Sequence, residues 1–253
     1  MIVIDLEATD LDRPRLIEFC AIAIPVKFIK SADSNWFRVL DKLSFCVYPR
    51  RNVSFEASNL TGLYNDILYD KKIFSNDHAE LIKLFIANQL PPVCLIAHNG
   101  FRFDFKLIKT ELFYIGASLP EDLICVDSLM IFNKIYNQSN KESDFKPSAF
   151  HGARNIDQSL FDSINQKNES KASGQKQRRS CALNSLYKTL TGEDIQNAHS
   201  AESDCIALCR LIHEAPDQFW KVLNEFICSW KDIKSFEFVK ISTLPDGVFP
   251  SQT

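Results

Sequence analysis

The apolar residues in the first part of the chain form short runs and partial alternations that are typical of strands. Residues 1–4 are apolar and end at an acid, residues 16–26 are mostly apolar, and residues 41–48 (DKLSFCVY) alternate in part. Alternation puts every second side chain on one face of a sheet, and an uninterrupted apolar run indicates burial on both faces. We therefore predict three consecutive strands, the first with its carboxyl end at Asp5.

Helical spacing of apolar residues takes over after residue 74. Ser75 or Asn76 is expected to cap a helix, which Pro91 and Pro92 bring to an end. Apolar runs shorter than a helix then alternate with further helical patterns. Two further strands are predicted, at residues 93–97 and 123–126. One predicted helix begins at Asp104, and the others are at residues 128–135, 183–190, 200–213 and 218–230. Three strands followed by alternating strands and helices predict an α/β fold with a mixed sheet covered by helices.

A polar stretch from about residue 137 to 179 interrupts this pattern. It is rich in Ser, Asn, Lys and Gln and poor in apolar periodicity, so it is either a functional loop or a disordered one. The chain of 253 residues otherwise fits one domain. We expect this domain to cover residues 1–230, including the polar stretch, and residues 231–253 to form a C-terminal tail.

Charge and cysteine content narrow the function classes. The net charge is −3, so any attraction to nucleic acid must be local, through metal ions or a clustered basic segment. The eight cysteines form no CxxC pair and mostly stand in apolar runs, which favours buried thiols in a reducing compartment over zinc ligands or disulfides. The N-terminus has no signal-peptide pattern, and no apolar run approaches the ~20 residues that span a bilayer. We therefore expect an intracellular protein, in the cytoplasm, the nucleus or both, without membrane contact.

Two acids lie at the end of the first predicted strand. Asp5 and Glu7 are two residues apart, so their side chains point to the same face, where two carboxylates repel each other unless a cation lies between them. The spacing alone fits either a metal site or a strand end that faces solvent.

Three further residues suggest the same chemistry. Asp104 opens a helix after the turn that follows a buried strand, and Asp204 stands five residues after His199 at the start of a late helix. Each of these positions also has an ordinary interpretation, because acids are favoured in the first turn of any helix. The combination and order of the four acids and the histidine favour a site with hard oxygen ligands, which suits Mg²⁺ or Mn²⁺ better than zinc.

Taken in order, the strings DLEAT, HNGFRFDFKLI and HSAESD resemble the motifs of DEDDh 3′→5′ exonucleases, relatives of the proofreading exonucleases. The flanking strings DKLSFCVYP, NLTGL, LIAHNG, CVDS and LNSLYKTLTG are similar to the three-prime repair exonuclease (Trex) branch. The resemblance covers residues 1–230. It implies an RNase H-like (DnaQ-like exonuclease) fold with a mixed five-stranded sheet, three strands antiparallel and two parallel, flanked by helices.

The resemblance also implies the roles of the site residues. Asp5, Glu7, Asp104 and Asp204 would hold two Mg²⁺ ions, for which Mn²⁺ can substitute, and His199 would be the general base that takes a proton from the attacking water. Such a site hydrolyses phosphodiesters by in-line displacement. The implied activity is release of nucleoside monophosphates from DNA 3′ ends, with single strands preferred, in DNA repair and degradation.

Substrate-binding residues follow from the same resemblance. The backbone and side chains of Leu6 and Ala8 would touch the terminal nucleotide, and Leu60 would pack on the terminal bases. Phe103 stands where many relatives have a tyrosine, so the ring can stack but a hydroxyl contact is lost.

Basic residues cluster at the end of the polar stretch, at Lys176, Arg178 and Arg179. Such a cluster is most often an ordinary solvated loop. In an otherwise acidic chain, and just before the helices that lead to His199, we expect it to contact DNA phosphates.

The strand at residues 41–48 suggests an assembly. An uncovered apolar strand edge invites pairing, and in the family this strand pairs with its copy in a second subunit, so we expect a homodimer. Two other functions remain open. An RNA-directed DEDDh exoribonuclease, of the oligoribonuclease or RNA-trimming type, would share all the site residues, and a non-catalytic nucleic-acid-binding adaptor would be expected to have lost one of them.

Overall fold

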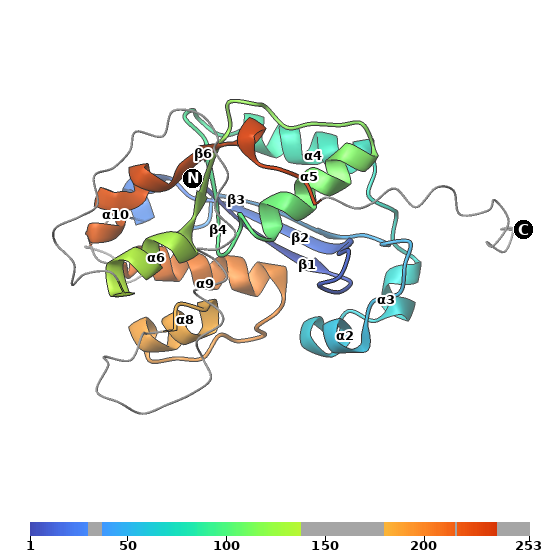
Figure 1. Cartoon of the computed structure of the whole chain (residues 1–253), viewed down its shortest axis with the longest axis horizontal. Coiled ribbons are helices and arrows are strands. Elements are labelled where there is room, and N and C mark those ends of the chain that lie inside the picture. The colour runs from blue at the N-terminus through green and yellow to red at the C-terminus, as the bar shows by residue number, and fades with distance from the viewer. Residues whose placement is uncertain (30–36, 138–179, 216, 237–253) are drawn as a thin grey trace, which may run out of the picture.

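The computed structural model describes residues 1–29, 37–137, 180–215 and 217–236, and in this part of the chain one mixed sheet runs through the centre (Figure 1). Its strands are β1 (Ile2–Ala8), β2 (Leu16–Ala23), β3 (Asp41–Cys46), β4 (Cys94–Ala97), β5 (Ile124–Asp127) and β6 (Ile227–Ser229). The spatial order is β3-β2-β1-β4-β5-β6. The pairs β3–β2, β2–β1 and β5–β6 are antiparallel, whereas β1–β4 and β4–β5 are parallel.

Helices cover both faces of the sheet, and short helices lie at its ends (Figure 1). The α-helices are α1 (Val26–Ile29), α2 (Phe55–Thr61), α3 (Asn65–Tyr69), α4 (Asn76–Ala87), α5 (Asp104–Tyr114), α6 (Ser128–Asn137), α8 (Leu183–Thr191), α9 (Ala201–His213) and α10 (Gln218–Val222), and the 3-10 helices are η1 (Leu223–Phe226) and η2 (Trp230–Asp232). None of the helices in the described ranges has both the length and the apolar character needed to cross a membrane.

The alternation of β1 divides the core into two halves. Ile2, Ile4 and Leu6 point to the face covered by α4 and α5, where they pack in one buried cluster. Val3 points to the opposite face, covered by α6, α8 and α9, and packs in the other cluster. Asp5 and Glu7 share the face of Val3, because side chains two residues apart on a strand lie on the same side. The two acids of β1 therefore face α9.

Two predictions made from the sequence are wrong at the C-terminal side of the sheet. Within the described ranges the sheet has six strands where five were expected, and residues 218–230 do not form one helix, since α10 gives way to η1 and then to β6. The outer edge of β5 would otherwise leave backbone groups unpaired, and β6 pairs with them: the N–H of Trp230 donates to Leu123 O at 2.8 Å, just beyond the paired residues. Trp230 and Ile233 are buried, so the core continues past residue 230.

Strand boundaries also differ from the prediction at the first strand. β1 continues to Ala8 and does not end at Asp5, because it pairs with β2 along its whole length, with a bulge between Glu7 and Ala8. A bulge re-aims the side chains around it. All eight cysteines are in described residues and are free thiols, and five of them are buried.

Candidate active site

Asp104 is brought to β1 by the turn that joins β4 to α5. The carboxylate of Asp127, at the end of β5, accepts the N–H groups of Asn99 and Phe101 at 2.9 and 3.1 Å and so holds the turn. Gly100 is required there, since a Cβ atom at this position would lie 2.6 Å from Ala97 Cβ. The turn delivers Asp104 to the first position of α5, where it is 3% exposed.

A hydrogen bond joins this acid to the strand that carries the other two. Asp104 Oδ1 accepts the N–H of Leu6 at 3.0 Å, between Asp5 and Glu7 in the sequence. Because the donor is a backbone group, the bond fixes the helix start relative to β1 whatever side chain stands at position 6. Asp104 is thereby held beside the end of β1.

His199 and Asp204 come from the entry into α9. His199 has a φ of 67°, in the left-handed region that a non-glycine residue seldom adopts, and its N–H donates to Asp204 Oδ2 at 3.1 Å. This bond closes the loop against the first turn of the helix. The backbone N–H of Ala201 donates to Glu18 Oε2 on β2 at 3.0 Å and ties the helix start to the sheet.

Three of the expected residues form a compact cluster. Glu7, His199 and Asp204 each offer one ligand atom, and these atoms all lie within 4.8 Å of one another. The cluster joins the end of β1 to the start of α9, two segments almost 200 residues apart in the sequence. The structure thus brings Glu7, His199 and Asp204 together, and Asp5 and Asp104 are close enough to interact electrostatically with Glu7.

The carboxyl groups of the site have raised pKa values. Burial and repulsion from Asp204 are the leading causes that raise the pKa of Glu7 to about 9, and burial raises that of Asp104 to about 7 against two backbone hydrogen bonds that lower it. The pKa of Asp5 is raised well above its usual range by burial and then by the charge of Asp104. The pKa of Asp204 is raised by burial, while its bond from the His199 backbone acts the other way. Four carboxylates in this space cannot all ionise without added positive charge.

A divalent cation fits this donor set. Asp204 Oδ1 is buried and has no hydrogen-bond partner within the described part of the chain, an unfavourable state for a carboxylate oxygen. Its neighbours Glu7 and His199 offer oxygen and nitrogen ligand atoms at metal-binding spacing. Hard carboxylate oxygens suit Mg²⁺ and Mn²⁺, and a bound cation would offset the burial and the repulsion that raise the pKa values of these carboxyl groups.

The expected substrate-binding residues differ in their access to solvent. Leu6 is 3% and Ala8 8% exposed, so both side chains are buried. Leu60 on α2 is 57% exposed, and the ring of Phe103 is partly buried directly before Asp104. The remaining three, Lys176, Arg178 and Arg179, lie outside the described residues, as does nearly all of the polar stretch.

Two acids that support the site were not singled out from the sequence. Glu18 is the cross-strand partner of Glu7 and adds to the causes that raise the pKa of Glu7. Asp127 is fully buried, and its pKa is raised to about 6 by burial despite its backbone hydrogen bonds. The sequence signal that could have found them is an acid inside or at the end of an apolar strand, in LIEFCAIA for Glu18 and in ICVD for Asp127. Only the pairing of the strands shows which residue each of these two acids faces.

Comparisons with known proteins agree with this architecture. The family model described as Exonuclease (RNase_T) matches residues 2–167. The chain is 29% identical to three-prime repair exonuclease 1 of Bos taurus over 257 residues, covering 96% of this chain and 72% of the bovine protein. It is 30% identical to three prime repair exonuclease 2 of Mus musculus over 260 residues, covering 97% of this chain and 94% of the mouse protein.

Solved structures with the same fold are more distant in sequence. E. coli exonuclease I in complex with a dT13 oligonucleotide aligns with a TM-score of 0.58 at 16% identity, over 88% of this chain and 42% of that one. The nuclease domain of 3′hExo, described as a DEDDh family member bound to rAMP, aligns with a TM-score of 0.56 at 14% identity, over 84% of this chain and 88% of that one. The chain thus spans less than half of exonuclease I, and both likenesses concern the fold.

Proposed function

This chain belongs to the exonuclease (RNase_T) family and, within it, to the three-prime repair exonuclease branch, and we propose that it releases nucleoside monophosphates from DNA 3′ ends by metal-assisted hydrolysis. Membership makes the chain a 3′→5′ exonuclease, with a nucleic acid as its substrate. The DNA preference, the metal mechanism and the roles of individual residues are the parts that we propose.

The observation that carries the proposal is the convergence of Glu7, His199 and Asp204. Asp5 and Asp104 lie near enough to interact electrostatically with Glu7. Asp5, Glu7, Asp104 and Asp204 would hold two divalent cations, Mg²⁺ in the first place. Bound there, the ions supply an activated water and stabilise the leaving oxygen of an in-line displacement. The buried Asp204 oxygen without a partner in the described chain and the raised pKa values of Glu7 and Asp104 support this assignment.

His199 would act as the general base of the reaction. Its ring offers a nitrogen within 4.8 Å of carboxylate oxygens of Glu7 and Asp204, where the attacking water would be held. A neutral imidazole is a common general base in enzymes and can accept the proton of that water. The hydrogen bond from the His199 backbone to Asp204 keeps base and ligand together.

The terminal nucleotide would be bound next to the acids. Backbone groups of Leu6 and Ala8 line the end of β1, Leu60 offers an exposed apolar side chain on α2, and Phe103 offers a ring directly before Asp104. Lys176, Arg178 and Arg179 would contact phosphates further along the strand, since basic side chains provide most of the sequence-independent affinity for nucleic acid.

DNA is favoured over RNA by the sequence relatives. Both mammalian relatives are named repair exonucleases, and both match nearly the whole of this chain. The fold does not decide the question, because structures solved with DNA and with a ribonucleotide align about equally well. The RNA-directed exoribonuclease therefore remains the alternative to be tested.

The deciding experiment compares 5′-labelled single-stranded DNA and RNA of one sequence, each with Mg²⁺ and with EDTA, and follows shortening from the 3′ end. We expect stepwise shortening of DNA, much slower shortening of RNA, and no reaction in EDTA. Asp204→Ala serves as the inactive control at matched folding. Faster loss of RNA than of DNA would establish the alternative, and full activity in EDTA would contradict the metal mechanism.

A further inference from the structure

The chain after β6 runs back along α5 towards the candidate active site. We call residues 230–236 the C-terminal segment. Its first part is anchored in the core, because Trp230 and Ile233 are buried, and Lys109 Nζ on α5 donates to Trp230 O at 2.7 Å. The Oγ of Ser229 donates to Glu121 O at 2.7 Å just before the segment begins. The segment is thus bound to α5 and to the turn before β5.

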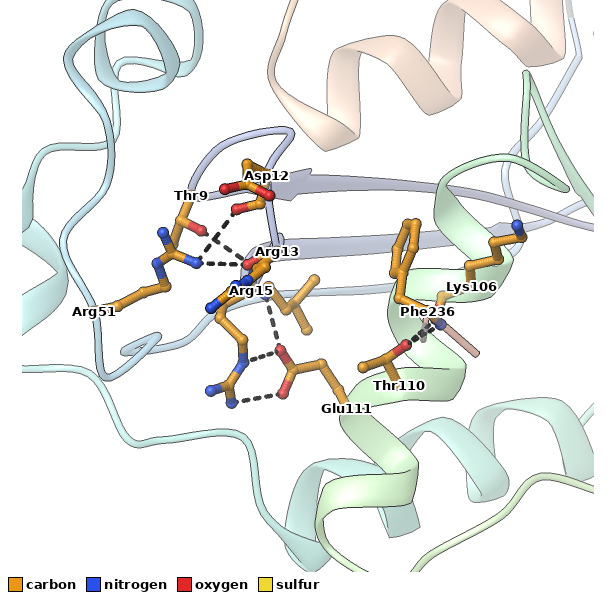
Figure 2. A network of polar contacts seen from close by, with 10 residues as sticks. Thr9, Asp12, Arg13, Arg15, Arg51, Lys106, Thr110, Glu111 and Phe236 are labelled. Carbon is orange, nitrogen blue, oxygen red and sulfur yellow. Dashed lines mark hydrogen bonds and ion pairs between the residues drawn. The ribbon is translucent and has the colours of Figure 1, made fainter. Parts of the chain in front are cut away.

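The last described residue of this segment, Phe236, lies against the first turns of α5. Its backbone N–H donates to Thr110 Oγ1 at 2.9 Å, and Lys106 Nζ lies 5.9 Å from the centroid of its ring. Figure 2 shows Phe236, Lys106 and Thr110 together on this side of the helix. The ring of Phe236 packs edge-on against that of Phe103, with centroids 6.4 Å apart and planes at 67°.

Phe103 directly precedes Asp104 and depends on packing for its orientation. Its backbone has φ −129° and ψ −78°, so it stands outside the helix, and its side chain makes no capping hydrogen bond. Its N–H donates to Asn99 O at 3.1 Å, which fixes the backbone but does not restrict the side-chain torsions. A ring without a polar group keeps one rotamer only if neighbouring side chains exclude the others.

We propose that Phe236 is a positioning residue that holds the ring of Phe103 in the orientation that receives the terminal nucleotide. This inference rests on the proposed function, since it assigns Phe103 to the nucleotide. It makes the C-terminal segment, which lies beyond the residues 2–167 that match the exonuclease family, part of the substrate site of this chain. Thr110 and Lys106 hold Phe236 in place from the helix.

The test is a double-mutant cycle of Phe236→Ala and Phe103→Ala, measured as binding of a short single-stranded DNA whose last linkage is a phosphorothioate. Phe236→Ala alone is expected to weaken binding about 2- to 10-fold, the range of an aromatic pair. In the Phe103→Ala background the same change should have no effect, because a residue that acts through another loses its influence when that residue is gone. In turnover assays on ordinary DNA, KM should rise and kcat should hold.

Controls separate positioning from loss of folding. Phe236→Tyr keeps the ring and should restore wild-type affinity, and Phe236→Leu fills a similar volume without a ring and should not. Phe113→Ala removes an exposed phenylalanine at the far end of α5 and should bind DNA as the wild type does. Melting temperatures of all variants are compared at the assay conditions.

The proposal would be overturned if Phe236→Ala weakened binding equally in the wild-type and in the Phe103→Ala background. Phe236 would then touch DNA by itself or act through the fold. Wild-type affinity in Phe236→Ala or in Phe236→Leu would overturn the proposal as well. A wild type that binds the DNA probe but hydrolyses nothing would contradict the proposed function alone, because the cycle is read from binding.

Discussion

Glu7 shows how one side chain links stability to metal binding. Its carboxyl group has a pKa raised from 4.5 to about 9, chiefly by burial and then by the charge of Asp204. Between these two values the folded state binds more protons than the unfolded state, so the folded state loses stability as the pH rises through this window. A bound cation would reverse the effect by stabilising the ionised carboxyl group.

We therefore predict that Mg²⁺ raises the melting temperature more at pH 8 than at pH 6. Glu7→Gln removes the ionisable group and should weaken the Mg²⁺ effect at pH 8 without lowering the metal-free melting temperature. Thermal denaturation with and without Mg²⁺ at both pH values measures this. A Mg²⁺ effect in Glu7→Gln as large as in the wild type would argue against Glu7 as a ligand.

His199 gives the second prediction at the scale of single residues. His199→Ala should lower kcat by about 10²- to 10⁴-fold, the usual contribution of a general base, and leave DNA affinity nearly unchanged. Single-turnover rates and equilibrium binding, measured on the same preparation, separate the two effects. Loss of affinity with turnover of the bound complex preserved would make His199 a substrate ligand.

The connection between β2 and α5 illustrates how elements are held together. The carboxylate of Glu111 on α5 accepts two hydrogen bonds from Arg15, one from Nε at 2.7 Å and one from a terminal nitrogen at 3.0 Å (Figure 2). It also accepts a hydrogen bond from the backbone N–H of Leu16 at 3.1 Å. The Glu111 side chain is 3% exposed and that of Arg15 29% exposed. The pair joins the start of β2 to the helix whose first residue is Asp104.

Arg15→Ala should destabilise the protein by about 3 kcal/mol or more, because it leaves a buried carboxylate without its cation. Lys188→Ala is the matched control: Lys188 pairs with Asp194 on the surface, with side chains 63% and 73% exposed, and its loss should cost less than about 1 kcal/mol. Chemical denaturation of both variants gives the free energies of unfolding. If both variants lost the same free energy of unfolding, burial of the Arg15–Glu111 pair would make no difference to its contribution to stability.

At the scale of the whole molecule, β3 is an outer strand of the sheet. Its residues pair with β2 so that Phe45 faces Phe19 and Ser44 faces Cys20, and Val47 N–H donates to Ile17 O in the same register. Antiparallel pairs alternate between bonded and non-bonded, so the backbone groups of Ser44 point away from β2. This outer edge supports the homodimer expected from the sequence, in which a second β3 would pair with it.

We predict a molar mass in solution of about twice the 28.9 kDa of one chain. Ser44→Pro removes an outward N–H and should yield monomers, whereas Phe45→Pro removes a donor that faces β2 and should damage the sheet itself. Light scattering at micromolar concentration measures the mass, and circular dichroism reports the fold. A wild-type mass near that of a single chain would exclude the dimer without affecting the nuclease assignment.

Much of the fold was predictable because its signals are local. The apolar runs of β1, β2, β4 and β5 and the helical spacing of α4, α5 and α9 follow from burial on a sheet face or a helix stripe. The order of motifs also indicated the family and the five candidate catalytic residues. Local signals did not predict β6, because its three residues become a strand only by pairing with the free edge of β5.

The sequence by itself determined the candidate residues for the proposed chemistry: carboxylates and an imidazole at the ends of predicted elements, in an order typical of one enzyme family. Only the tertiary structure decided how they meet. Strand alternation places Asp5 and Glu7 on the face towards α9, and a hydrogen bond from the backbone of Leu6 fixes Asp104. The left-handed backbone of His199 lets its N–H bond to Asp204. Likewise Phe236 reaches Phe103 through packing between segments far apart in the chain, a contact that no pattern along the sequence encodes.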